Sequence, residues 1–319
     1  MDVNCTLEWF DTCPTDIYTS GGGDMTLLQS PAYISAVAEK EGQRAKYCKI
    51  SINGQNAGYA GFLEKKALGK GLHVIKLDRG PVWGEGFGDI SHFEAFLKAF
   101  RSSYPKRLGR RIRLIPEIPV NDDVEQMLKN HRFRKKSEPY QTLIVDLTQD
   151  PKDIRDQFRK NWRGSLNKAE REGLQMDWDD EGKYAHWLTK FYCFDKRTRG
   201  YKGPSQKFLN LLAKHCVPNK EYLIGRVMQD GLAIAAILVL LHGHKDRRAA
   251  TYQIGWNTQK GRETGAHNFA LWQAVLELQK RKTHTLDLGG VNDTEGEHVK
   301  KFKTGMGGTL LTLPGVYVG

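Results

Sequence analysis

The last third of the chain carries the residues whose types and spacing could do chemistry. Asp287-Leu288-Gly289-Gly290 is typical of a strand that ends in a turn, and Lys303 follows in a segment rich in lysine and glycine. Glycine at a strand end lets a ligand approach the backbone closely, and a fixed ammonium can stabilise an oxyanion. The residue types alone leave plainer alternatives open, with Gly289 and Gly290 as a simple turn and Lys303 as an exposed lysine beside Lys300.

A basic helix and a central strand hold further candidates for binding. Arg163 and Lys168 lie on a predicted amphipathic helix, where they either face substrate phosphate or RNA, or are merely solvated. Tyr252 lies on a predicted central strand over residues 249–256, where core packing and substrate contact are both open to it.

Common catalytic motifs are absent from the sequence. It contains no GxxxxGK[ST] phosphate loop, no HExxH or DxDxDG metal motif, no GxSxG turn and no GxGxxG that opens a helix. His242-Gly243-His244 has no acidic or thiolate residue nearby, so we predict a turn there. We therefore expect neither ATP nor a metal as cofactor. An enzyme built this way would use a pre-activated donor and rely on positioning and electrostatics.

The elements that would position these residues occur twice. The tight-turn dipeptides Asn53-Gly54 and Asp230-Gly231 lie 177 residues apart. Each is followed by an apolar strand, over 57–63 and 232–238, then by an amphipathic helix and a short apolar strand. The nearly constant offset predicts a tandem α/β unit, although hairpins and amphipathic helices are common in any α/β chain.

A helix start is predicted at Asp150-Pro151. Asp150 can accept backbone N–H bonds as the N-cap, and Pro151 suits the first helical position. Ile154, Phe158, Trp162 and Leu166 recur every four residues, which predicts one helix with an apolar stripe that runs on toward Gly173.

The composition is that of a basic globular protein. The 319 residues suffice for two domains, and the formal net charge is +12, from 49 Lys+Arg against 37 Asp+Glu. This balance favours a polyanionic partner such as RNA, a nucleotide-linked substrate or an anionic membrane surface, and the alternative is a solvated basic surface. The cations cluster over residues 106–113, 132–136 and 155–171.

The cysteines and the apolar segments bear on the compartment. Five widely spaced cysteines form no CxxC pair, and no signal peptide is visible at the N-terminus. The longest apolar run, over 232–241, is too short to cross a bilayer. We expect a monomer in a reducing cytoplasm, with contact to an anionic membrane surface left open.

An ordered set of segments resembles the FemA/FemX-type family of aminoacyl-tRNA-dependent peptidyltransferases. The set comprises Trp162-Arg163-Gly164 through Lys168-Ala169-Glu170 to Gly173, then Thr198-Arg199-Gly200-Tyr201, Asp287-Leu288-Gly289-Gly290 and Phe302-Lys303-Thr304-Gly305. The resemblance covers nearly the whole chain. It implies an α/β (α+β) fold of two tandem GNAT-like domains, over residues 1–147 and 148–319, and leaves open whether the last residues pack back on the first domain.

The resemblance also implies roles for single residues. Lys303 would support charge that develops on the carbonyl under attack, as the catalytic residue. Arg199 would hold the acceptor's phosphates, with Tyr201 beside it, since an arginine fork suits a diphosphate. A cationic helix C-cap is the plainer alternative for Arg199. The remaining candidates for substrate binding are Arg163, Lys168, Tyr252, Gly289 and Gly290.

The activity implied is amide-bond formation, in which an amino acid passes from aminoacyl-tRNA to the amine of a small-molecule or peptide acceptor. Without a coiled-coil arm, the chain resembles the armless FemX kind. Ala36 and Val37 replace a lysine of relatives that bind a cell-wall precursor, and Trp83-Gly84-Glu85 replaces an aspartate, so the acceptor stays open. Two rivals remain, an acyl-CoA N-acyltransferase on the same fold and a non-catalytic RNA-binding protein. The segment 262–267 matches the R/Q-x-x-G-x-G/A pattern for coenzyme A only in part, because His267 ends it.

Overall fold

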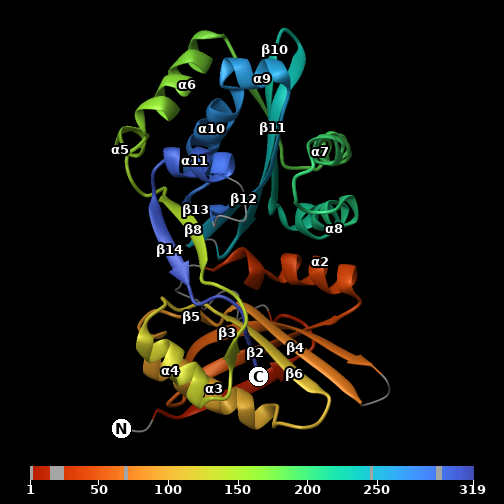
Figure 1. Ribbon diagram of the computed structural model, residues 1–319, viewed down its shortest axis with the longest axis vertical. Coiled ribbons are helices and arrows are strands. Elements are labelled where there is room, and N and C mark those ends of the chain that lie inside the picture. The colour runs from red at the N-terminus through yellow and green to blue at the C-terminus, as the bar shows by residue number, and fades with distance from the viewer. Residues whose placement is uncertain (1–2, 15–24, 68–70, 245–246, 292–296) are drawn as a thin grey trace. The chain divides into compact units, whose positions relative to one another are not determined.

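Two compact units make up the computed structural model, which describes residues 3–14, 25–67, 71–244, 247–291 and 297–319 (Figure 1). Unit 1 comprises Met1–Tyr140 and Thr312–Gly319, and unit 2 comprises Gln141–Leu311. The predicted boundary between residues 147 and 148 therefore falls later in the chain than the boundary between the units. The last eight residues belong to unit 1.

Unit 1 is built on one mixed sheet in the order β1-β2-β3-β4-β6-β15-β7, with β5 beside β3. Its strands are β1 (Cys5–Phe10), β2 (Arg44–Ile52), β3 (Gln55–Ala67), β4 (Leu72–Gly80), β5 (Val82–Trp83), β6 (Arg110–Pro116), β7 (Arg134–Lys135) and β15 (Tyr317–Val318). Its helices are η1 (Leu27–Gln29), α2 (Pro31–Glu41), α3 (Ile90–Ser103) and α4 (Asp122–Asn130).

The two faces of this sheet carry different helices because neighbouring strand residues point to opposite sides. Phe62 of β3 packs in a core with Phe96 and Phe100 of α3, whereas the next residue, Leu63, packs with Ile34 of α2. Helix α3 also makes the crossover that places β6 parallel to β4.

Unit 2 repeats this plan around a sheet in the order β14-β8-β13-β12-β11-β10-β9. Its strands are β8 (Tyr140–Asp146), β9 (Gln175–Asp179), β10 (Tyr222–Gln229), β11 (Leu232–His242), β12 (Arg248–Asn257), β13 (Thr283–Gly290) and β14 (Thr309–Leu313). Its helices are α5 (Pro151–Asp156), α6 (Lys160–Arg171), α7 (Ala185–Arg199), α8 (Gln206–Cys216), η2 (Val217–Asn219), α9 (Gln259–Thr264), α10 (Ala266–Lys280) and α11 (Glu297–Gly305). Helices α6 and α10 cover one face and α7 and α8 the other (Figure 1).

The predicted duplication is confirmed at its hairpins. Asn53-Gly54 joins β2 to β3 and Asp230-Gly231 joins β10 to β11, and all four turn residues have positive φ. In both units a bulge follows the turn closely in the second strand, with Ala57 of β3 and Ile234 of β11 as the extra residues. Residues 141–146, which the predicted bounds place in the first domain, belong to β8 of the second sheet, between β14 and β13.

The helix predicted from Asp150 starts as expected but is not continuous. The Asp150 side chain accepts a hydrogen bond from the N–H of Lys152, and α5 begins at Pro151. The helix then breaks before α6, and the N–H of Arg159 donates to the carbonyl of Gly305 at 2.9 Å. The four-residue apolar stripe survives the break because Phe158 and its partners stay buried on both sides of it. The end of α11 therefore contacts the chain at the break between α5 and α6.

No helix in the described part of the chain is both long enough and apolar enough to cross a membrane.

Candidate functional site

The site starts where two parallel strands of unit 2 part. Strands β12 and β13 pair from Arg248↔Thr283 to Thr251↔Asp287. Beyond that point β12 continues along β11 and β13 continues along β8. In unit 1 the corresponding strands β4 and β6 stay paired as far as Gly80↔Pro116. An opening of this kind therefore forms between β12 and β13 but not between β4 and β6.

The turn at the end of β13 is fixed by one carboxylate. Gly289 has a φ of 77°, a left-handed conformation that favours glycine. Its N–H donates to Asp287 Oδ1 at 2.7 Å, and the hydroxyl of Thr142 on β8 donates to the same carboxylate. These bonds hold Gly290 with its carbonyl oriented toward α11.

Lys303 meets that carbonyl from α11. Its side chain is buried, with a relative exposure of 7%, and Nζ donates to Gly290 O at 2.8 Å. The preceding residue, Phe302, packs with its ring centroid 6.2 Å from Trp162 on α6 and 5.2 Å from His267 on α10. The ammonium is thus held at the opening by the packing of three helices.

Lys303, Phe302 and His267 line a hollow of about 380 Å³, which we call the β12 hollow. Its principal lining residues are Tyr252, Asn257, Arg262, His267, Phe302 and Lys303.

An aromatic dyad forms one wall of the β12 hollow. Tyr252 Oη and His267 Nε2 lie 2.9 Å apart, and the absence of a side chain at Gly255 lets the two rings approach. Burial lowers the pKa of His267 from 6.5 to about 4 and raises the pKa of Tyr252. Both groups are therefore neutral at pH 7, and His267 adds no second cation beside Lys303.

A buried acceptor lies in the same wall. Asn257 Oδ1 is shielded from solvent and has no hydrogen-bond partner among the described residues. Buried polar atoms are nearly always satisfied, so an orphan acceptor at a hollow is expected to meet a polar group of a ligand. A donor such as an amine or ammonium suits it.

Two of the sequence candidates lie on a separate cluster of unit 2. Arg199 ends α7, and its Nε donates to Asp195 Oδ1 at 2.8 Å. The hydroxyl of Tyr201 donates to the other oxygen of Asp195 at 3.2 Å. Burial, and then the charge of Asp195, raises the pKa of Tyr201. Arg199 and Tyr201 therefore share one carboxylate and do not line the β12 hollow.

The cations of α6 have local partners. Arg163 Nη2 donates to the backbone oxygens of Asp156 and Phe158, across the break between α5 and α6. Lys168 Nζ donates to Glu263 O on α9 at 2.6 Å. Four of the sequence candidates thus lie together at the opening: Lys303, Gly289, Gly290 and Tyr252. The other four lie outside the hollow: Arg163, Lys168, Arg199 and Tyr201.

Sequence reasoning missed His267 and Asn257 as site residues. His267 was noted only as the residue that breaks a coenzyme A pattern. A signal was present, because a histidine in the first turn of a helix with a broad apolar face needs a polar partner. Asn257, at the end of a strand, carried no comparable signal.

Comparison with known proteins identifies the fold. Residues 156–303 match the model of the acetyltransferase (GNAT) domain. No curated protein matches the chain in sequence. A crystal structure of FemX superposes with a TM-score of 0.80, at 14% identity, over 98% of this chain and 96% of that chain.

Two further solved structures align at lower scores. A tandem GNAT protein from the clavulanic acid biosynthesis pathway has a TM-score of 0.54 at 11% identity, over 98% of both chains. L-PGS from Bacillus licheniformis has a TM-score of 0.50 at 12% identity, over 92% of both chains. The predicted α/β fold of tandem GNAT-like domains, similar to FemX, is confirmed.

The neutral His267 makes stability depend on pH. The folded pKa of about 4 lies below the unfolded value near 6.5, so the unfolded chain binds the extra proton. The stability that neutral His267 contributes is complete above pH 6.5 and is lost as the pH falls toward 4, on the order of 3 kcal/mol in all. His267→Gln should reduce the pH dependence of the free energy of unfolding between pH 7 and 4.5, and urea denaturation measures this free energy at each pH.

His298→Gln is the matched control, since His298 lines the same hollow but is exposed. An equal pH dependence in wild type and His267→Gln would contradict the buried neutral imidazole.

Proposed function

We propose that this chain, which has the tandem GNAT fold of FemX, is an aminoacyltransferase that moves an amino acid from aminoacyl-tRNA to an amine. The observation that carries the proposal is the buried Lys303 ammonium at the opening between β12 and β13, beside two neutral groups. An ammonium fixed beside a hollow can stabilise an oxyanion, and GNAT-fold chemistry is acyl transfer to an amine.

The reaction balances without a cofactor. The lone pair of the acceptor amine attacks the ester carbonyl carbon of the donor, and a C–N bond forms. The ester C–O bond then breaks, the ribose hydroxyl leaves with a proton, and the nitrogen loses its proton. The ester is already activated, so the protein has to supply position and electrostatic stabilisation.

Lys303 is proposed to stabilise the oxyanion. Its Nζ is an ammonium donor held by Gly290 O, and three N–H groups allow it to keep that bond and donate to a substrate oxygen as well. Because His267 stays neutral, no neighbouring charge on the dyad opposes the lysine. The hydroxyl of Tyr252, with its raised pKa, stays protonated and serves as a hydrogen-bonding group rather than a base.

Asn257 favours an aminoacyl group over a simple acyl group. The α-ammonium of an aminoacyl ester is a donor with no acceptor capacity, and it complements the orphan oxygen Asn257 Oδ1. An acetyl group has no such donor. Arg199, on its own cluster with Tyr201 and Asp195, is proposed to bind an anionic part of the acceptor.

The donor experiment tests this function directly. The protein should form amide product with a pool of charged tRNA and a panel of amines, read by mass spectrometry, and RNase treatment should abolish the product. Full activity with acetyl-CoA after RNase treatment would instead establish an acyl-CoA N-acyltransferase. If no product forms with either donor, the result contradicts a transferase and favours a non-catalytic RNA-binding protein.

Lys303→Ala should lower kcat by roughly 10²–10³ with nearly unchanged KM, because its contact strengthens in the transition state. The readout is steady-state amide formation. Lys301→Ala is the matched control, since Lys301 on the same helix is exposed and pairs with Glu297. If the Lys303→Ala variant folds normally and has the kcat of the wild type, Lys303 does not stabilise the oxyanion and has only a structural role.

Asn257→Ala should weaken use of an aminoacyl donor through kcat/KM by roughly 10–100-fold, the range for a lost hydrogen bond to a charged group. The key comparison is an N-acetylated aminoacyl-tRNA, whose amide is uncharged. Wild type should discriminate against this donor, and Asn257→Ala should not.

Asn268→Ala, which changes the same hollow from α10, is the control. Equal discrimination by wild type and Asn257→Ala would show that Asn257 Oδ1 does not recognise the α-ammonium.

A further inference from the structure

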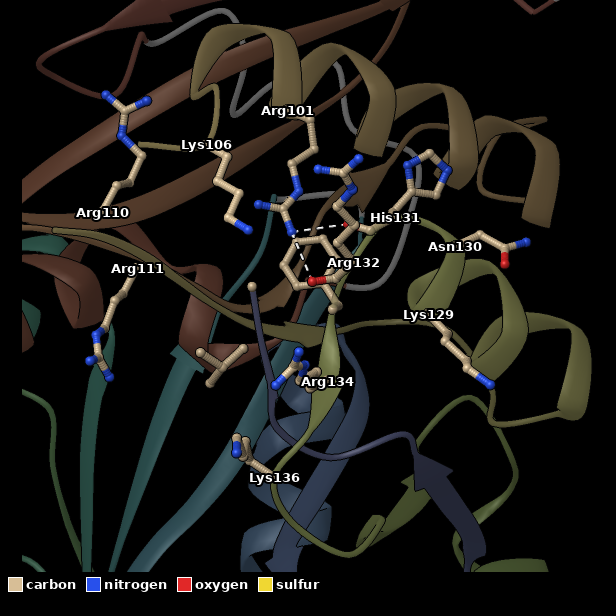
Figure 2. Close-up of a pocket in the computed structure, with 13 residues that line it drawn as sticks. Arg101, Lys106, Arg110, Arg111, Lys129, Asn130, His131, Arg132, Arg134 and Lys136 are labelled. Carbon is tan, nitrogen blue, oxygen red and sulfur yellow. Dashed lines mark hydrogen bonds between the residues drawn. The ribbon is translucent and has the colours of Figure 1, made fainter. Parts of the chain in front are cut away.

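A second hollow lies wholly within unit 1 and is lined by cations (Figure 2). Its volume is about 990 Å³, and we call it the cationic basin. Its lining residues come from the ends of α3 and α4, from β6, β7 and β15, and from the segments beside them. Six of its cations are Arg101, Lys106, Arg111, Lys129, Arg134 and Lys136.

These six cations lack carboxylate partners. In the described part of the chain none of them forms an ion pair, and no aspartate or glutamate lines the basin. Elsewhere in unit 1 arginines are paired, as in Arg113 with Asp78 and Arg79 with Glu117. The basin therefore keeps like charges together without acidic neighbours, which opposes folding through mutual repulsion.

One guanidinium is fixed at the floor of the basin. Arg101 stacks on the ring of Phe133, with its Cζ 4.0 Å from the centroid. Its Nη2 donates to His131 O at 3.0 Å and reaches Arg132 O at 3.5 Å (Figure 2). Burial, and then the charge of Arg132, lowers the pKa of Arg101. Its remaining N–H groups have no acceptor among the described residues, so a fork is left for a ligand.

A neighbouring arginine shows that proximity alone does not make a ligand contact. Arg110 also borders the basin, but its guanidinium donates to Pro105 O and to His73 Nδ1, and in Figure 2 it points away from Arg101. It contributes to the electric field of the basin without offering its fork there.

We propose that the cationic basin binds the phosphodiester backbone of RNA, which under the proposed function is the tRNA part of the donor. Arg101 would contact a phosphate at the floor, and Lys129, Arg134 and Lys136 would contact phosphates along the rim. Arginine forks and lysine ammonium groups are the usual phosphate ligands, and each contact releases counterions.

The shape of the basin favours an RNA chain over a membrane. A polynucleotide backbone is narrow enough to enter a concave surface and reach Arg101, whereas the plane of lipid headgroups would meet the rim cations alone. Leu108, 98% exposed in the adjacent loop, is a single apolar side chain. Stable binding in the membrane interface needs a broad apolar face.

The test compares two variants of the full chain that lose three charges each. The basin variant combines Lys129→Gln, Arg134→Gln and Lys136→Gln. The control combines Arg44→Gln, Lys65→Gln and Lys66→Gln, which are exposed residues of unit 1 outside the basin. Binding of a fluorescent RNA hairpin that carries no amino acid is measured by anisotropy over a series of KCl concentrations.

We expect the basin variant to bind RNA at least about 10-fold more weakly, with a slope of log K against log salt that is flatter by roughly 2–3. The control should stay near wild type. Arg101→Lys, which keeps the charge but loses the fork, should weaken RNA binding while it retains most of the salt slope.

Equal RNA affinity of the basin variant and the control would overturn the proposal. So would unchanged RNA affinity of the basin variant together with lost binding to phosphatidylglycerol vesicles, because the basin would then be a membrane surface. The hairpin carries no amino acid, so a failed transfer reaction leaves this measurement unaffected, and failed RNA binding leaves the Lys303 result unaffected.

Discussion

A buried ammonium is the constraint on which the site of unit 2 depends. The buried Nζ of Lys303 donates a hydrogen bond to Gly290 O, and that carbonyl is oriented because Asp287 holds the turn before it. The helix that carries the lysine is in turn held where Arg159 donates to Gly305. The break between α5 and α6 loses helical hydrogen bonds, but it frees the N–H of Arg159 for this bond, which positions α11.

The two units show how one plan yields an opening between parallel strands in one copy and not in the other. Both have an antiparallel meander, a crossover helix and a parallel strand. In unit 1 β4 and β6 remain paired to their ends, so the backbone groups satisfy one another. In unit 2 the strands part after Thr251 and Asp287, so other groups must satisfy the backbone N–H and C=O groups that the ladder no longer pairs. The dyad of Tyr252 and His267 occupies part of that space.

Charge is handled in two ways in this basic protein. Arginines such as Arg113 and Arg79 are paired with carboxylates. In the cationic basin the cations stand together without acidic partners, and Arg101 is partly removed from water as well. Repulsion of this kind is relieved by a polyanion, so the basin exchanges stability of the isolated chain for affinity.

Local features were determined by the sequence itself. The turns at Asn53-Gly54 and Asp230-Gly231, the helix start at Asp150 and the tandem plan follow from φ preferences, capping and periodicity, which act over a few residues. The tertiary structure decided the rest. The helical stripe from Ile154 could not reveal a break that is made by Gly305. Tyr252 and His267, or Asp287 and Thr142, meet only after sheets and helices pack, because these contacts join distant parts of the chain. The clusters at 106–113 and 132–136 were visible as charge, but Arg101 joined them only in the folded unit, since its stacking on Phe133 is a contact between two elements.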